Sequence, residues 1–165
     1  MSRVRELLIN PISVLVFDVD GVLASYEYGD HNHNACRDDE WMKYVCSHKP
    51  YRKARPLKTI QNFLKYLQTS GFDLNRVFVC TQCFGEEELT EKKYFVVNNY
   101  PISIANIYKV GSEEEKLTVL NFIHDSFFPD VPDENIIMID DTAAVLTHIQ
   151  NNSGYSTVHI STFME

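Results

Sequence analysis

Val14-Leu15-Val16-Phe17-Asp18-Val19-Asp20-Gly21 is the segment from which the architecture of this chain can be predicted. Its first four residues are aliphatic or aromatic and include two valines, which is typical of a strand buried on both faces. Such strands lie in the middle of parallel α/β sheets, where ligands bind beyond the carboxyl ends of the strands. Two carboxylates and a glycine turn stand at that end. The segment therefore predicts a central strand that leads into a cation site.

The rest of the chain alternates strands with helices. Four further apolar runs have the composition of strands, at about 77–81, 104–110, 136–140 and 156–160. Helical periodicity lies between the runs, at about 56–70, 86–98, 112–127 and 142–150. Pro56 is expected as the first helical residue of its helix, with Gly71 just beyond the end, and Ser112 with Glu115 predicts a capping box. The alternation predicts right-handed crossovers and a three-layer α/β/α, Rossmann-like fold with a central parallel sheet of about five strands.

Length and composition indicate a globular chain. The 165 residues are 44% hydrophobic and 23% charged, which suits a single domain spanning 1–165. The net charge of -8 repels polyanions, so binding of nucleic acid would require a local basic patch. No apolar run approaches the roughly 20 residues of a membrane span. Arg3, Arg5 and Glu6 do not suit a secretory signal, so no membrane association and a cytoplasmic location are expected.

The segment 24–53 separates the first strand from the first core helix. It is polar and aromatic, with a short helix predicted at about 38–45. Long connections in compact domains tend to be functional. We interpret it as a small insertion, a possible flap over the site.

Cysteine and histidine positions raise two further possibilities. Cys80 and Cys83 have the spacing of a redox pair, but they follow a strand rather than open a helix, so free thiols are favoured. A second group lies within the insertion, and its spacing matches no established zinc pattern. Polar surface residues are therefore favoured over a zinc site for this group, which comprises His31, His33, Cys36, Cys46 and His48.

Polar residues suited to phosphate chemistry are expected along one edge of the sheet, because the carboxyl ends of parallel strands meet there. They are Asp18, Asp20, Thr81, Lys116, Asp140 and Asp141. Carboxylates without histidine or thiolate partners select a hard cation, Mg²⁺ before others. A hydroxyl and an ammonium suit phosphate oxygens. The set predicts a metal-assisted phosphate site.

In order and placement, these residues closely resemble the four signature motifs of the haloacid dehalogenase superfamily of aspartate-nucleophile phosphohydrolases. The motifs are matched by Asp18-Val19-Asp20-Gly21, Thr81, Lys116 and Asp140-Asp141. The resemblance runs from about Ser13 to about Ile160, apart from the insertion. The segment between Thr81 and Lys116 leaves no room for a cap domain, and the insertion is too short for a full helical cap. The resemblance therefore implies a small-cap or capless member with an open site.

The resemblance also implies a role for each residue. Asp18 would be the nucleophile that forms an aspartyl-phosphate, and Asp20 the general acid and base. Mg²⁺ would be held by the Asp18 carboxylate, the Asp20 backbone carbonyl and the pair Asp140 and Asp141. Asp141 is expected to bind directly and Asp140 partly through water. Thr81 and Lys116 would bind the transferring oxygens, with Lys109 as a competitor for the lysine role.

These roles predict a Mg²⁺-dependent phosphatase that hydrolyses phosphate monoesters, most simply a small phosphorylated metabolite. The basic run Tyr51-Arg52-Lys53-Ala54-Arg55 keeps a nucleic-acid end possible as substrate, as in polynucleotide 3′-phosphatases. The same residues would also suit a phosphotransferase with the same intermediate, or a catalytically silent binding or regulatory module. An open site also allows a homo-oligomer in which a neighbouring subunit covers it.

Overall fold

A parallel sheet forms the centre of the computed structural model, which describes residues 2–25 and 38–164. Within these residues the sheet has five strands, and every neighbouring pair is parallel. Across the sheet they are β5 (Ile107–Val110), β4 (Val77–Gln82), β1 (Val14–Phe17), β6 (Ile136–Asp140) and β7 (Ser156–His159). The predicted central position of the first strand is confirmed, because β1 pairs with both β4 and β6.

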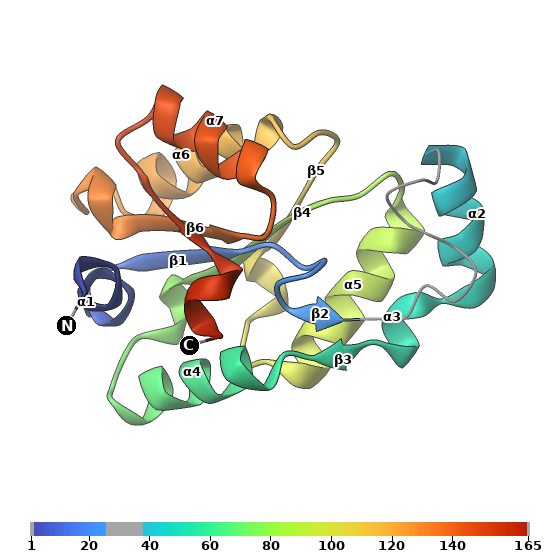
Figure 1. The fold of residues 1–165 in the computed structure, drawn as a ribbon, viewed down its shortest axis with the longest axis horizontal. Helices are drawn as coiled ribbons and strands as arrows, with labels where there is room; N and C mark the ends of the chain where they lie inside the picture. The colour runs from blue at the N-terminus through green and yellow to red at the C-terminus, as the bar shows by residue number, and fades with distance from the viewer. Residues whose placement is uncertain (1, 26–37, 165) are drawn as a thin grey trace.

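Helices cover both faces of this sheet, which confirms the three-layer α/β/α fold (Figure 1). One layer holds α4 (Lys58–Thr69) and α5 (Glu86–Asn99), and the other holds α6 (Glu115–Phe127) and α7 (Ala143–Asn152). Successive side chains of β1 point to opposite faces of the sheet. Leu15 and Phe17 pack in the cluster with α4 and α5, whereas Val14 and Val16 pack with α6 and α7. None of the helices in the described residues has the length and apolar character needed to cross a membrane.

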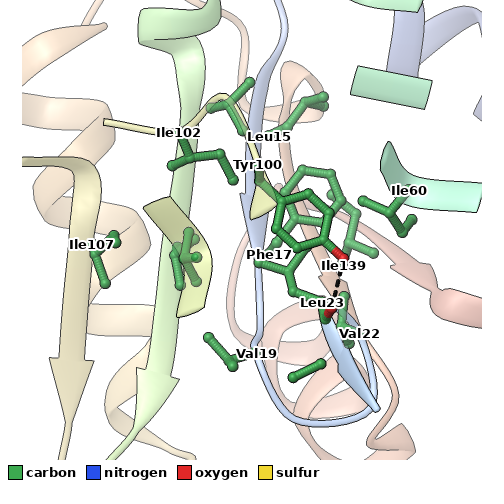
Figure 2. Packing of buried hydrophobic residues seen from close by; sticks show 14 of the residues in the cluster. Leu15, Phe17, Val19, Val22, Leu23, Ile60, Tyr100, Ile102, Ile107 and Ile139 are labelled. Atoms are coloured by element: carbon green, nitrogen blue, oxygen red, sulfur yellow. Dashed lines mark hydrogen bonds between the residues drawn. The ribbon is translucent and has the colours of Figure 1, made fainter. Parts of the chain in front are cut away.

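The loop after β1 is anchored in the first of these clusters. Figure 2 shows Leu15, Phe17, Ile139 and Tyr100 as members of this cluster. The Tyr100 hydroxyl donates to the carbonyl oxygen of Leu23 at 2.5 Å and accepts from the backbone N–H of Leu57 at 2.9 Å. One buried side chain thus joins the loop after β1 to the start of α4.

Two predicted helix starts were wrong. Pro56 belongs to β3 (Arg55–Pro56), which pairs antiparallel with β2 (Ala24–Ser25). This pairing holds Pro56 extended, and α4 starts only at Lys58. The capping box at the start of α6 is also absent from the described contacts of that helix, which begins at Glu115 with Glu114 at its N-cap. The Glu115 carboxylate accepts instead from the backbone N–H of Gly111 at 3.0 Å.

Short helical turns make up most of the remaining structure. The N-terminal helix α1 (Arg3–Ile9) was not predicted, and its first turn is capped by Ser2. The predicted strand at 104–110 starts as a 3₁₀ turn, and only its last four residues pair in the sheet. Among the described residues, the 3₁₀ turns are η2 (Leu74–Arg76), η3 (Ile104–Asn106), η4 (Asp133–Asn135) and η5 (Ile160–Phe163).

The described part of the segment between β2 and β3 lies against α5 (Figure 1). This part forms α2 (Asp38–His48) and α3 (Pro50–Lys53), so the predicted short helix extends three residues further. The Arg52 guanidinium donates two hydrogen bonds to Glu91 of α5, at 3.0 and 2.9 Å. Arg52, from the predicted basic run, is therefore already paired with an acid.

The possible zinc group falls partly outside the described residues, since His31, His33 and Cys36 belong to 26–37. Of the other two, the Cys46 thiol donates to Glu87 at 3.2 Å. His48 contacts the hydroxyl of Ser47 at 2.8 Å.

Candidate active site

The residues after β1 form a tight turn that carries two carboxylates, Asp18 and Asp20. The backbone N–H of Asp18 continues the sheet by donating to Ile139, and the N–H of Val19 donates to Asp18 Oδ1 at 2.8 Å. Gly21 follows with φ +74, a conformation that side chains with a Cβ rarely adopt. A Cβ at this position would also collide with the carboxylate of Asp141. Glycine therefore permits the close approach of the loops after β1 and β6.

Three carboxylates converge between these loops. One oxygen each of Asp18, Asp140 and Asp141 lies within 4.8 Å of the other two. Asp18 and Asp140 are buried, whereas Asp141 is exposed. Thr142 contributes its backbone N–H to Asp140 Oδ1 at 3.0 Å, which fixes that carboxylate from the start of α7.

Lys116 lies against this cluster without any exposed surface. Its Nζ is 2.8 Å from Asp140 Oδ2, 3.3 Å from Asp18 Oδ2 and 2.7 Å from Glu113 Oε2. Burial opposes the charge on Lys116, but the carboxylates of Asp18, Asp140 and Glu113 more than offset it and raise the lysine pKa. Lys116 is therefore an ammonium ion that neutralises one of several nearby negative charges.

The surroundings of Asp18 raise its pKa, mainly through burial. Burial raises this pKa from 3.8 to about 7, Lys116 opposes the rise, and the neighbouring Asp140 adds to it. Burial and Asp140 likewise raise the pKa of Asp141. Both shifts mean that the ionised cluster is costly without a further cation. Three oxygen ligands and excess negative charge fit a hard divalent cation, so this cluster can bind a metal ion.

A second buried lysine holds Asp20. Lys92 Nζ lies 2.8 Å from Asp20 Oδ2 and 3.3 Å from Glu88 Oε1. It also donates to the Thr81 hydroxyl at 3.0 Å. The other oxygen of Asp20 accepts from the Tyr51 hydroxyl at 2.6 Å. Asp20 is thus bound by one residue from α5 and one from the segment between β2 and β3.

A cavity of about 280 Å³ lies over these groups. Asp18, Asp20 and Asp141 line it, while Trp41 and Phe84 supply aromatic surface. Trp41 comes from α2, and its indole N–H donates to Glu88 at 2.9 Å. The cavity therefore has an anionic floor and a partly aromatic wall.

The predicted residues occupy two positions relative to this cavity. Asp18, Asp20 and Asp141 line it, whereas Asp140, Thr81 and Lys116 are fully buried. The structure thus brings five of the six into two charge clusters and connects Thr81 to Asp20 through Lys92. Lys109, the competing lysine, pairs with Glu86 instead.

Lys92, Tyr51 and Glu88 were not predicted as site residues from the sequence. Glu88 and Lys92 are four residues apart on the helix after the Thr81 strand, a spacing that places them on one face. An exposed helix shows the same spacing, so the sequence gives no sign of their burial. Tyr51 stood out in the sequence only as part of a basic run.

Comparison with known proteins gives a distant likeness among solved structures. No family model matches the chain, and no curated protein matches it. Among solved structures, the chain is similar to the HAD domain of effector protein Lem4 from Legionella pneumophila. The two are 16% identical, the match covers 89% of this chain and 84% of that chain, and the TM-score is 0.46.

Proposed function

We propose that this chain is a Mg²⁺-dependent phosphatase of the haloacid dehalogenase type, which hydrolyses phosphate monoesters. The observation that supports this most directly is the pairing of Asp18 with Asp140, Asp141 and Lys116 beneath a cavity. A carboxylate that lies between a metal-binding group and a buried ammonium is suited to attack phosphorus. The three carboxylates would hold Mg²⁺ together with the backbone carbonyl of Asp20, Asp141 directly and Asp140 partly through water.

Asp18 is the proposed nucleophile. One of its oxygens forms a bond to phosphorus as the bond to the ester oxygen breaks, which gives an aspartyl-phosphate and a free alcohol. Bound Mg²⁺ supplies the positive charge that lets an anionic carboxylate approach an anionic phosphate. Lys116, held 3.3 Å from Asp18, adds positive charge beside the transferring oxygens.

Asp20 is the proposed general acid and base. It lines the same cavity as Asp18, from the same turn. It gives a proton to the departing oxygen and then takes one from the water that hydrolyses the aspartyl-phosphate. The Thr81 hydroxyl accepts from Lys92 and can still donate its own proton, which we assign to a phosphoryl oxygen.

The segment 24–53 is proposed as a small insertion in a single domain rather than a full cap. Its contribution to the described cavity is the wall formed by Trp41. A small phosphorylated metabolite remains the first substrate class to test. A nucleic-acid end draws less support, because Arg52 of the basic run is paired with Glu91.

A panel of phosphate esters tests this function. It should include sugar phosphates, nucleotides and 3′-phosphorylated oligonucleotides, each assayed after chelation and again with Mg²⁺ restored. We expect turnover only with the metal, and a loss of at least about 100-fold in kcat for Asp18→Asn. Asp130→Asn, which removes an exposed carboxylate elsewhere, is the matched control.

Two results would contradict the proposal. Metal-dependent turnover that survives in Asp18→Asn would exclude Asp18 as the nucleophile. Failure to hydrolyse any ester of the panel would favour the silent binding module. Size-exclusion chromatography of the same sample would show whether a second subunit is available to cover the site.

A further inference from the structure

Asp20 is held at both carboxylate oxygens by residues with no role in the proposed reaction so far. The Tyr51 hydroxyl lies 2.6 Å from Oδ1, and Lys92 Nζ lies 2.8 Å from Oδ2. Because each oxygen has a donor, the carboxylate is fixed in both its position and its rotation. The side chain of Asp20 is 23% exposed, so part of it still faces the cavity.

Lys92 is itself fixed by its surroundings. It has no exposed surface, and its ammonium group contacts Glu88 at 3.3 Å and the carbonyl oxygen of Gln82 at 2.7 Å. Glu88 is held in turn, because Oε2 accepts from the backbone N–H of Phe84 and Oε1 from the indole of Trp41. Because so many acceptors surround the buried ammonium group, they hold the Lys92 side chain in one position.

Tyr51 brings the segment between β2 and β3 into the same network. Tyr51 is 1% exposed, and Lys92 Nζ lies over its ring, 5.6 Å from the ring centre. The neighbouring Arg52 ties this segment to Glu91 of α5. Tyr51 and Lys92 are therefore presented to Asp20 by one packed unit.

We propose that Lys92 and Tyr51 are positioning residues, which hold Asp20 where it exchanges a proton with the leaving group. This inference rests on the proposed phosphatase function and adds the segment between β2 and β3 to the catalytic apparatus. Proton transfer requires the carboxylate to be within hydrogen-bond reach of the ester oxygen. A displacement of about 1 Å can slow such a step about 100-fold.

The dependence of kcat/KM on the leaving group distinguishes a positioning role from a purely structural one, because a structural defect would lower kcat/KM equally for all esters. An alkyl phosphate needs a proton on its departing oxygen, whereas para-nitrophenyl phosphate releases a stable anion. Because kcat/KM reports the steps up to that departure, misplacing Asp20 should affect the alkyl ester more. For Tyr51→Phe we expect kcat/KM to fall about 10-fold on the alkyl ester and at most about 2-fold on the nitrophenyl ester.

Tyr100→Phe is the matched control, because it also deletes a buried tyrosine hydroxyl but one that bonds to Leu23 and Leu57. We expect it to leave the ratio of alkyl to nitrophenyl kcat/KM unchanged. Lys92→Met, where it folds by circular dichroism, should lower this ratio at least as much as Tyr51→Phe. Tyr51→Phe alone is sufficient for the test if Lys92→Met does not fold.

The outcomes separate this inference from the function on which it rests. An unmodified chain that hydrolyses neither ester overturns the phosphatase proposal. An active chain in which Tyr51→Phe leaves the ratio unchanged, or lowers both values equally, overturns the positioning role alone. A selective loss on the alkyl ester supports both.

Discussion

Replacing Asp18 by asparagine is expected to stabilise the metal-free chain at neutral pH, although the change removes the proposed nucleophile. Burial is the main reason that the pKa of Asp18 rises from 3.8 to about 7. At pH 7 the unfolded chain has lost this proton, whereas about half of the native molecules keep it. With about 1.4 kcal/mol for each pKa unit, ionising Asp18 costs the native state about 4 kcal/mol.

Asparagine removes this cost but not every unfavourable contact. Its amide oxygen can keep the bond from the Val19 N–H, which places its NH₂ group toward Lys116. Two donors then face each other, and this contact offsets part of the cost of about 4 kcal/mol that is removed. We therefore expect the free energy of unfolding to rise by a net of about 2 kcal/mol. For a chain of this length, that gain corresponds to a rise of about 4–8 °C in Tm.

The sign of the pH dependence follows from the same shift. Because the native pKa of Asp18 lies above the unfolded value, the native state binds more protons between about pH 4 and about pH 7. Stability of the unmodified chain should therefore fall across this window as the pH rises. Asp18→Asn should lose that fall, so its advantage should shrink as the pH decreases. Toward pH 4 the variant should become the less stable of the two proteins, because only its unfavourable contact with Lys116 remains.

Urea unfolding followed by circular dichroism, in EDTA at pH 5 and pH 7, measures this difference. Asp130→Asn should behave like the unmodified chain. Added Mg²⁺ should stabilise the unmodified chain more than Asp18→Asn, because the variant lacks one proposed ligand. The prediction would be refuted by a variant that is less stable than the unmodified chain at pH 7, or by a difference that is equal at both pH values.

Two further predictions concern neighbouring residues. Gly21→Ala should weaken Mg²⁺ binding at least about 10-fold by calorimetry, because the added Cβ displaces Asp141. Gly71→Ala is its control, since Gly71 has φ +85 but an added Cβ there would meet no atom within 4 Å, so it should show backbone strain of about 1–2 kcal/mol without a change in metal affinity. Lys116→Met should lower kcat at least about 100-fold in the ester assay, through loss of charge beside Asp18. Lys109→Met should retain most of the activity, and equal losses in both lysine variants would contradict the assignment.

The fold was predictable because the strands of this sheet are short apolar runs that lie between helical segments. Asp18, Asp20, Asp140 and Asp141 follow directly from that pattern, since each lies at or just after the end of such a run. The helix start at Ser112 failed for a local reason, because the Glu115 carboxylate accepts from the Gly111 N–H instead. The start at Pro56 failed because of a tertiary contact. Pairing of Pro56 with Ala24 joins residues far apart in the chain, and propensity alone does not show it.

The role of Lys92 could not be predicted from the sequence, for a different reason. Its helix α5 buries Glu88, Glu91 and Lys92 along with Phe95 and Val96. Charged residues on the buried face blur the apolar periodicity from which burial is usually inferred. Their role depends on α2 and α3 packing over the helix, and this contact is tertiary.

The bond between Tyr51 and Asp20 also sets a limit on how this chain can be redesigned or can diverge. Exchanging the loop between β2 and β3 is an obvious route to a new substrate range, because Trp41 lines the cavity. A graft that replaces 38–49 and keeps Tyr51 would change the wall and preserve the contact to Asp20. A graft that removes Tyr51 would alter recognition and proton transfer together, so new specificities should arise more readily from the first kind of exchange.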